Sequence, residues 1–427
     1  MTTRPTRPDR PLATAQDTPA SVVTQAATPR APRPLDLWLL GAALCLLGGG
    51  TVIVYSSSAV FATQHKGDDL YFLKRHLMYL CMGGVAMWLG AKVHYQSWKR
   101  FAHVGLFASL GALAGVLVLG SKINGATRWF RVGPASFQPA ELAKIALVIY
   151  LAYSLGKKAE KVRSFTVGFL PHLMIAGIMM GLLLMQPDLG NAVIIGATVM
   201  VLLFVAGAKI SYMLLALMAG APVIYYAIVG TPWRMQRMLA YFDPWQHRRS
   251  GAGYQITESL ISIGSGGMWG LGLGEGKQKL FFLPEAHNDF IAASLGEELG
   301  LIGLIALLLL CIAVVVRGVR AAVGARDAFG MYLAFGFTAL FGMQALVNLG
   351  VVMGLLPAKG LPLPLVSYGG TSLIFYMFGL GVLMNVGTRT EPAPAALRGL
   401  RLWGPSREGM ARRRRRALGP ATFSTEG

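Results

Sequence analysis

The sequence predicts an all-α integral membrane protein with ten transmembrane helices. Of its 427 residues, 54% are hydrophobic and only 14% are charged, and the mean hydropathy is +0.53. Soluble domains carry about 25% charged residues. Long stretches without charge recur along the chain, and none shows the alternation of a membrane barrel. Helices pair their backbone groups within the segment, so they are the structure expected for such spans.

Ten apolar stretches approach or exceed the roughly 20 residues that a membrane-spanning helix needs. The second is short unless residues 71–75 extend it, and the fourth is interrupted by Glu141 and Lys144. The predicted spans are residues 37–64, 76–91, 101–121, 139–156, 164–187, 189–208, 210–233, 299–316, 328–358 and 360–388. They form one membrane domain over residues 35–389. Residues 230–298 then form a large extracytoplasmic loop between helices 7 and 8.

The distribution of Lys and Arg predicts the orientation of the chain. With the N-terminus inside, the short inner loops hold eleven of these residues and the short outer loops hold seven, as the positive-inside rule requires. Both tails, residues 1–34 and 390–427, are then cytoplasmic, and their composition is typical of disorder. The arginine run at 412–416 could contact anionic lipid or nucleic acid. We interpret it as a topogenic tail and predict no nucleic-acid partner.

Acidic side chains gather just before the eighth span, in a chain with only 19 acidic residues. The ionisable residues here are Glu285, His287, Asp289, Glu297 and Glu298. A carboxylate beside a low-dielectric surface has a raised pKa and can act as a general base. Alternatively, Asp289 caps the helix that follows it. A structural role is expected for Glu297 and Glu298.

The large loop contains two further segments with distinct composition. Residues 231–251 mix aromatic and basic side chains at a spacing compatible with an amphipathic helix on the membrane. Residues 261–276 hold seven glycines, which predicts turns or re-entrant backbone. Neither a phosphate-binding loop nor a dinucleotide-binding fingerprint is present.

Ionisable residues also occur at the spans. Glu141 and Lys144 are one helical turn apart on the same face, as a structural ion pair or as part of a cavity. Asp188 follows a Gln-Pro pair between two spans. It either caps the next helix or joins Glu141 and Lys144 in one polar cluster within the membrane.

Two other outer segments carry candidate binding residues. Residues 122–138 contain Arg128, Trp129 and Arg131, an aromatic and basic cluster that suits the headgroup level. The segment before the last span contains Lys359, three prolines and a polar run that begins at Ser367. Cations, carboxylates and aromatic rings beside lipid suit an enzyme acting on an anionic lipid-linked substrate. They equally suit a transporter vestibule, so these patterns leave both classes open.

Four motifs resemble the SEDS family of bacterial cell-wall polymerases: GATRWFRVG, QPDLG, LPEAHNDF and PAKGLPLPLVSYGG. The resemblance covers residues 36–389, in order and at family-like spacing. Within the family, the amino-acid sequence of these motifs is most similar to the member that acts in cell division, and less similar to the elongation member. The resemblance implies a ten-helix SEDS fold.

The resemblance also implies an activity, a substrate and partners. It implies a glycosyltransferase of the bacterial inner membrane that polymerises lipid II into septal glycan strands. The implied partners are a class B penicillin-binding protein and other divisome membrane proteins. No cofactor is certain, and a divalent cation, Mg²⁺ or Mn²⁺, is one expectation for the leaving diphosphate.

The aspartate of the LPEAHNDF motif, here Asp289, is the residue that the resemblance implies to be catalytic, as a general base. The expected substrate-binding residues are Arg128, Trp129, Lys279, His287, Lys359 and Ser367. Glu141, Lys144 and Asp188 are expected to shape a polar cavity within the membrane.

Three alternatives remain from the sequence. The first is an elongation polymerase of the same family. A lipid II flippase would use Glu141, Lys144 and Asp188 as a path across the bilayer. A scaffold that only recruits the crosslinking enzyme would not need Asp289 for division.

Overall fold

The computed structural model describes residues 34–123, 126–132, 135–158, 161–248, 251–277 and 282–389. The two predicted tails, except for residue 34, lie outside these residues. The candidate Lys279 also lies outside them. The helical elements are α1 (Leu37–Lys66), α2 (Tyr71–Lys92), η1 (Tyr95–Phe101), α3 (Ala102–Leu119), α4 (Pro139–Lys157), η3 (Phe165–Phe169), α5 (Leu170–Met185), α6 (Leu189–Val205), α7 (Ile210–Val229), α8 (Pro232–Phe242), α9 (Gly251–Gly266), α10 (Ile291–Val323), α11 (Ala328–Val352) and α12 (Thr371–Thr388). The strands are β1 (Ser121–Ile123), β2 (Ala126–Val132) and β3 (Ala135–Phe137).

The helices confirm the predicted membrane architecture. Eight helical segments of the described chain are long and apolar enough to cross a bilayer: α1, η1 with α3, α4, η3 with α5, α7, α10, α11 and α12. α6 is shorter, with 17 residues, and α2 has 22 residues but is less apolar. The count of ten spans, which needs both of these helices, stays a prediction.

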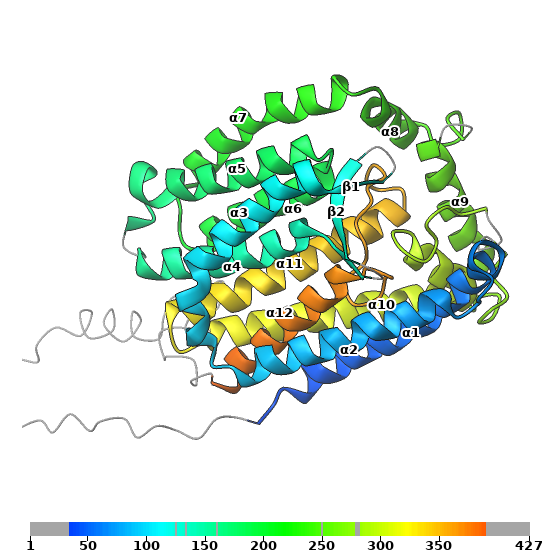
Figure 1. The fold of residues 1–427 in the computed structure, drawn as a ribbon, viewed down its shortest axis with the longest axis horizontal. Coiled ribbons are helices and arrows are strands. Elements are labelled where there is room, and N and C mark those ends of the chain that lie inside the picture. The colour runs from blue at the N-terminus through cyan, green and yellow to red at the C-terminus, as the bar shows by residue number, and fades with distance from the viewer. Residues whose placement is uncertain are drawn as a thin grey trace, which may run out of the picture. The chain divides into compact units, whose positions relative to one another are not determined.

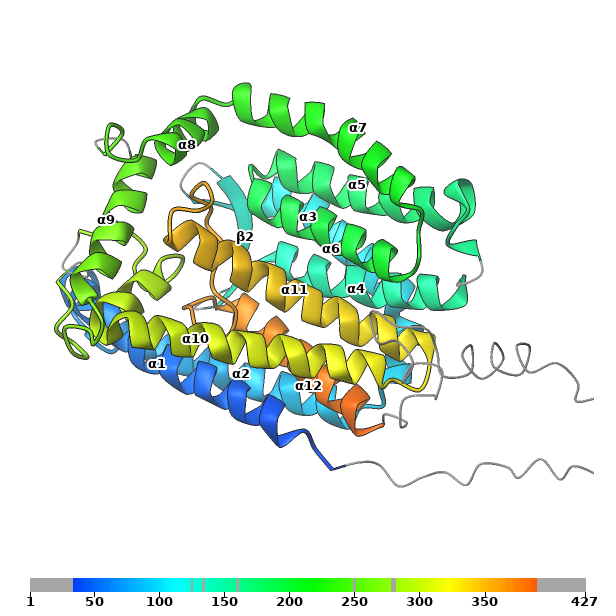
Figure 2. The ribbon, with the colours of Figure 1, turned by 180° about the vertical axis from the view of Figure 1, so that it is seen from behind.

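α11 is the central helix of the described bundle. It packs against α4, α6, α10 and α12, while α2 lies along α12 and α1 along α10. α7 has no buried residue and runs along the edge of the bundle (Figures 1 and 2). The sheet, α8 and the segment before α12 lie at one end of the bundle, and the start of α1 and the end of α12 lie at the other (Figure 1).

The structure differs from the sequence predictions in four places. α10 begins at Ile291, whereas the eighth span was predicted to begin at residue 299. An antiparallel sheet in the order β1-β2-β3 occupies residues where no strand was predicted. α9 continues to Gly266, so the first part of the glycine-rich segment is helical rather than irregular. The last span begins at Thr371, not residue 360. The helix predicted in residues 231–251 is confirmed as α8.

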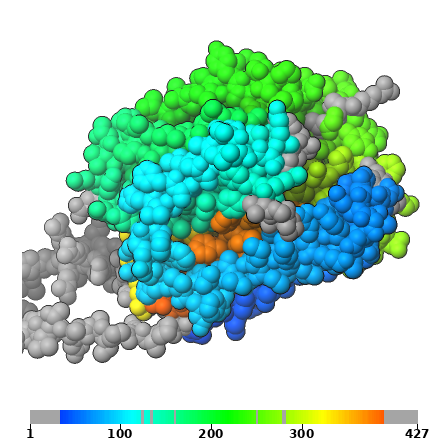
Figure 3. Space-filling model, viewed as in Figure 1, coloured from blue at the N-terminus to red at the C-terminus, as the bar shows by residue number. Residues whose placement is uncertain are grey.

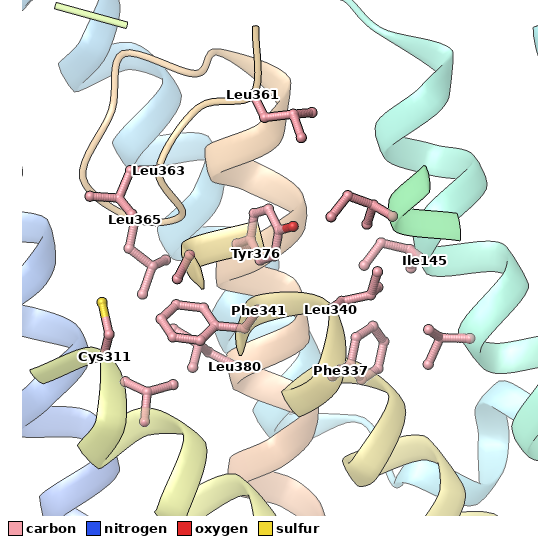
Figure 4. Close-up of a cluster of buried hydrophobic side chains, with 14 of the residues drawn as sticks. Ile145, Cys311, Phe337, Leu340, Phe341, Leu361, Leu363, Leu365, Tyr376 and Leu380 are labelled. Atoms are coloured by element: carbon pink, nitrogen blue, oxygen red, sulfur yellow. The ribbon is translucent and has the colours of Figure 1, made fainter. Parts of the chain in front are cut away.

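Residues 353–370, here called the connector, join α11 to α12 without a helix. Its prolines lack a backbone donor and disfavour helix. The alternating leucines between them are buried, with Leu361, Leu363 and Leu365 at 1–2% exposure. Figure 4 shows these side chains beside a cluster that includes Phe341 of α11 and Tyr376 of α12. The connector is therefore anchored in the hydrophobic core.

Two amide side chains of α11 hold the carbonyl groups of the connector. Nδ2 of Asn348 donates to the carbonyl of Leu361 at 2.7 Å and to that of Asp289 at 2.8 Å. Nε2 of Gln344 donates to the carbonyl of Pro362 at 2.9 Å. Asn348 thus joins the connector to the acidic segment before α10.

α10 is broken at Gly300, whose φ of 67° and ψ of −163° are not helical. The glycine-rich segment after α9 pairs with the break: the amides of Leu271 and Gly272 donate to the carbonyls of Glu297 and Glu298. Oε1 of Glu297 also accepts from the amide of Lys277 at 2.7 Å. Both glutamates are buried. Their contacts favour the structural role expected from the sequence.

Replacing Asn348 with Leu should loosen the connector and the acidic segment together. The side chain keeps the number and branching of its heavy atoms, but the carbonyls of Asp289 and Leu361 lose their donor, at about 1–3 kcal/mol each. Hydrogen–deuterium exchange should become faster in residues 284–292 and 357–366. Leu346→Ala on the exposed face of the same helix is the matched control and should leave both segments unchanged. Unchanged exchange in Asn348→Leu would contradict the bridging role.

Candidate active site

The acidic segment is folded into a tight turn that ends at α10. Glu285 has a φ of 58°, in the left-handed region that is uncommon for residues other than glycine. Its carbonyl accepts from the amides of Asn288 at 3.0 Å and Phe290 at 3.3 Å. Phe290 is the N-cap of α10, without a side-chain cap hydrogen bond. The alternative in which Asp289 caps this helix is therefore wrong, and its carboxylate is left for another use.

Asp289 lies at the wall of a cavity of about 1260 Å³ at the sheet end of the bundle. β2 contributes Arg128 and Trp129, and the connector contributes Lys359. His287 lines the same cavity. Five of the residues predicted from the sequence are thus gathered around one space, although they come from three separate parts of the chain. The orange C-terminal segment is visible between the blue and cyan segments in Figure 3.

Burial raises the pKa of Asp289 to about 7, and the negative charges of Glu285 and Asp188 act in the same direction. The positive charges of Arg237 and Arg128 oppose this rise. A group with such a pKa exchanges a proton readily near neutral pH. The carboxyl is close to the connector, because a Cβ atom added at Gly360 would lie 2.9 Å from Oδ2 of Asp289.

Six Lys and Arg residues line the cavity, and three of them, Arg128, Arg237 and Lys359, belong to β2, α8 and the connector. Nε of Arg128 donates to the carbonyl of Gln186 at 3.1 Å. Nη1 of Arg237, on α8, donates to the carbonyl of Ala358 at 3.2 Å. Burial lowers the pKa of Lys359, as do the neighbouring guanidinium groups. These contacts orient the cations without neutralising them, so the cavity suits an anionic ligand.

Aromatic rings form another part of the cavity wall. The ring of His287 lies 4.7 Å from that of Phe72 and 5.8 Å from that of Tyr368, between centroids. The amide of Tyr368 donates to the carbonyl of His287 at 3.1 Å. Burial lowers the pKa of His287, although Glu285 opposes the effect. The lowered pKa favours the neutral imidazole, and the backbone contact links the acidic turn to the connector.

Four predicted residues do not line this cavity. Oγ of Ser367 accepts from the amide of Leu363 at 2.8 Å, inside the connector. Nζ of Lys144 contacts Glu141 at 2.8 Å and Gln344 at 2.7 Å, and all of these side chains are buried. Ser367 thus stabilises the connector from within, and the ion pair supports the connector through Gln344.

Asp188 does not join the ion pair into one cluster. Its side chain caps α6 by accepting from the amide of Asn191 at 3.1 Å. Nδ2 of Asn191 donates to its other oxygen at 2.9 Å. The prediction that Asp188 caps the next helix is confirmed. The alternative, in which Asp188 joins Glu141 and Lys144 in one polar cluster, is wrong. Asp188 lines a second, smaller cavity instead.

The sequence interpretation overlooked several residues that build the site. Asn348 and Gln344 are amides inside an apolar span, and buried polar side chains in a membrane are costly unless they have partners. The presence of two such costly side chains in one apolar span was the signal that the sequence offered. Arg237 was interpreted only as part of an amphipathic helix, and nothing in its spacing indicated that it faces Asp289.

The described residues offer no group of three or more His, Cys, Asp or Glu side chains that could hold a metal ion. The cavity around Asp289 is lined mainly by cations and aromatic rings. These residues do not fit a preformed site for the Mg²⁺ or Mn²⁺ that the resemblance allows.

Comparison with known proteins gives consistent matches over the membrane domain. A probable peptidoglycan glycosyltransferase FtsW of Geobacter metallireducens is 46% identical over 361 residues, which cover 84% of this chain and 96% of that protein. The stage V sporulation protein E of Bacillus subtilis is 38% identical and covers 82% of this chain and 96% of its own length.

Solved structures agree with these matches. The rod shape determining protein RodA of Thermus thermophilus has 30% identity and a TM-score of 0.61, over 84% of this chain and 98% of that chain. A chain from a structure described as "Structural coordination of polymerization and crosslinking by a peptidoglycan synthase complex" has 31% identity and a TM-score of 0.70, over 83% and 97%. The family model for FtsW, RodA and SpoVE, described as "Cell cycle protein", matches residues 37–391. As the resemblance to the SEDS polymerases predicted, this chain belongs to the FtsW/RodA/SpoVE family.

Proposed function

We propose that this chain is a peptidoglycan glycosyltransferase that polymerises lipid II into glycan strands during cell division. The observation that carries the proposal is the position of Asp289 in a cavity that also holds Arg128, Arg237 and Lys359. A base and several cations in one space suit transfer of a sugar from a diphosphate carrier. The names of the FtsW relatives support the same activity.

In the proposed reaction, the carboxylate of Asp289 accepts the proton of the attacking sugar hydroxyl of the acceptor. The oxygen bonds to the anomeric carbon of the donor, and the carbon–oxygen bond to the diphosphate breaks. Polyprenyl diphosphate leaves with the electron pair, and attack from the opposite face inverts the anomeric centre. Arg128 and Lys359 stabilise the charge that develops on the diphosphate. Trp129 and His287 provide ring faces for the sugars.

The geometry gives less support to the flippase alternative. A flippase needs polar side chains along a path through the bilayer. Glu141 and Lys144 satisfy each other, and Gln344 takes up the remaining contact of the lysine. They support the connector, and neither residue lines the cavity. A path through them would have to break a buried ion pair, which is strongly destabilising.

The protein is a multi-pass membrane protein, and we place its work at the division septum of the bacterial inner membrane with both termini in the cytoplasm. The similarity to a chain from a complex that coordinates polymerization and crosslinking supports a class B penicillin-binding protein as its partner. Other divisome membrane proteins would complete the assembly.

Replacing Asp289 with Asn should abolish polymerisation of purified lipid II in detergent, with a loss of about 10²–10⁴-fold in rate. Glycan formation without a membrane to cross also separates a polymerase from a flippase. The variant should unfold at the same temperature as the wild type or higher at pH 8, because it removes a buried charge whose folded-state pKa is raised. A stable variant with wild-type polymerisation would refute the role of Asp289.

The rate of polymerisation should fall as the pH is lowered through about 7, because protonated Asp289 cannot accept a proton. Glu285→Gln removes a negative charge that raises this pKa, so the acidic limb should move to lower pH while activity at pH 8 is retained. The readout is the pH profile of glycan synthesis. An unmoved limb would mean that Asp289 does not control it.

Depletion of the protein in growing cells distinguishes division from elongation. The division role predicts long filaments without septa. Cells that instead become spheres would assign the chain to elongation.

A further inference from the structure

A second cavity of about 220 Å³ adjoins the large one. The two share Arg128, Arg237 and Lys359, and the smaller cavity adds Arg234 of α8. Asp289 lines only the larger cavity. The smaller space is therefore lined by four cations, three of which it shares with the cavity of the proposed base.

These four cations have no carboxylate partner among the ion pairs of the described residues. Arg128 and Arg237 donate to backbone carbonyls only. Asp188 is the acidic residue in the lining, and its two oxygens accept hydrogen bonds from Asn191. The cavity thus carries an excess of positive charge that an anion with more than one charge would balance.

Arg234 gives independent evidence for a ligand. The residue is 8% exposed, and one of its nitrogens, Nη1, donates to the carbonyl of Ala227 at 2.8 Å. Its Nε is buried and has no hydrogen-bond partner. A buried guanidinium without full hydrogen bonding is costly, so this donor calls for an acceptor in the cavity.

The remaining lining specifies more than a free anion. Leu189 and Gly190, at the start of α6, bring a helix N-terminus, where the backbone dipole favours phosphate. Ile228, Trp233 and Met238 add apolar contacts. α7, which ends at Val229 and has no buried residue, leads from this point along the edge of the bundle. A charged head with a hydrocarbon chain fits this combination.

We propose that the smaller cavity is the subsite for the polyprenyl diphosphate leaving group, with Arg234 and Arg237 as its diphosphate ligands. The inference deepens the proposed function, because it assigns one half of the donor to a place distinct from the sugars. Sugars occupy the large cavity, and the first isoprene units lie against Trp233 and Met238. The shared cations, Arg128 and Lys359, lie at the junction where the glycosidic carbon–oxygen bond breaks.

The test is equilibrium binding of farnesyl diphosphate to the purified full-length Asp289→Asn protein in detergent, in which no turnover interferes. Farnesyl diphosphate should bind at least about tenfold more tightly than farnesyl monophosphate, because the second phosphate adds charge-assisted hydrogen bonds. Adding the substitution Arg234→Gln should weaken the binding of farnesyl diphosphate by about tenfold or more. Arg131→Gln, which changes an exposed arginine of the larger cavity only, is the matched control and should have no effect.

Competition experiments identify the source of the anion. Inorganic diphosphate should displace the farnesyl probe, at higher concentration because it lacks the chain. Phosphatidylglycerol vesicles should not displace it, and displacement by them would reduce the cavity to a general site for anionic lipid and overturn the proposal. Equal affinities for the two farnesyl phosphates, or equal losses in Arg234→Gln and Arg131→Gln, would also overturn it.

Two further observations keep the test independent of folding and of the proposed function. If Arg234→Gln unfolds at a lower temperature, Arg237→Gln replaces it with the same expected loss. If binding follows the predicted pattern but the wild-type chain forms no glycan, the subsite stands and the polymerase assignment is refuted. If the wild-type chain forms glycan but binding does not follow the predicted pattern, the polymerase assignment stands and the subsite is refuted.

Discussion

Asn348 of α11 makes the contact on which the site depends. Its amide reaches the carbonyls of Asp289 and Leu361 at once, and so fixes the acidic turn against the connector that carries Lys359. Near a membrane, backbone outside a helix needs such partners because water does not supply them. A buried amide near the C-terminal end of an apolar helix thus holds two irregular segments at a defined separation.

The buried ion pair of Glu141 and Lys144 also supports the connector. Lys144 contacts Gln344, and Gln344 in turn donates to the connector at Pro362. Tyr376 of α12 donates to the same amide oxygen at 2.5 Å. The buried ion pair therefore supports, through Gln344, a connector residue that lines the cavity, and neither charged side chain lines the cavity itself.

The cavity combines a carboxyl that is costly to ionise with three cations, Arg128, Arg237 and Lys359, that have no carboxylate partner among the ion pairs of the described residues. The two features are complementary. Arg237 and Arg128 limit the rise in the pKa of Asp289 that burial and Glu285 produce, which keeps a usable fraction ionised near neutral pH. An anionic substrate would relieve the mutual repulsion of the cations when it binds. The electrostatics of the site thus favour an anionic ligand.

Hydropathy predicted the helical membrane fold because long apolar runs allow few other structures. The position of Asp289 came from a motif, and the structure adds its burial and partners. Residues 121–137 were not predicted as strands, although the Asn-Gly pair at 124–125 is a hairpin signal that the sequence interpretation overlooked. Ser367 and Asp188 look like surface polar groups in sequence, but local backbone donors satisfy both. Arg234 and Arg237 belong to the site only because α8 folds back over it, which no spacing rule encodes.

The most direct test of the account is a structure of the Asp289→Asn protein with lipid II bound in both donor and acceptor positions. The account predicts that the attacking hydroxyl of the acceptor lies within hydrogen-bond reach, about 2.6–3.2 Å, of the side chain at position 289. It also predicts that this hydroxyl faces the anomeric carbon of the donor. A bound pair whose hydroxyl is out of reach of this side chain, with another base beside it, would contradict the central claim.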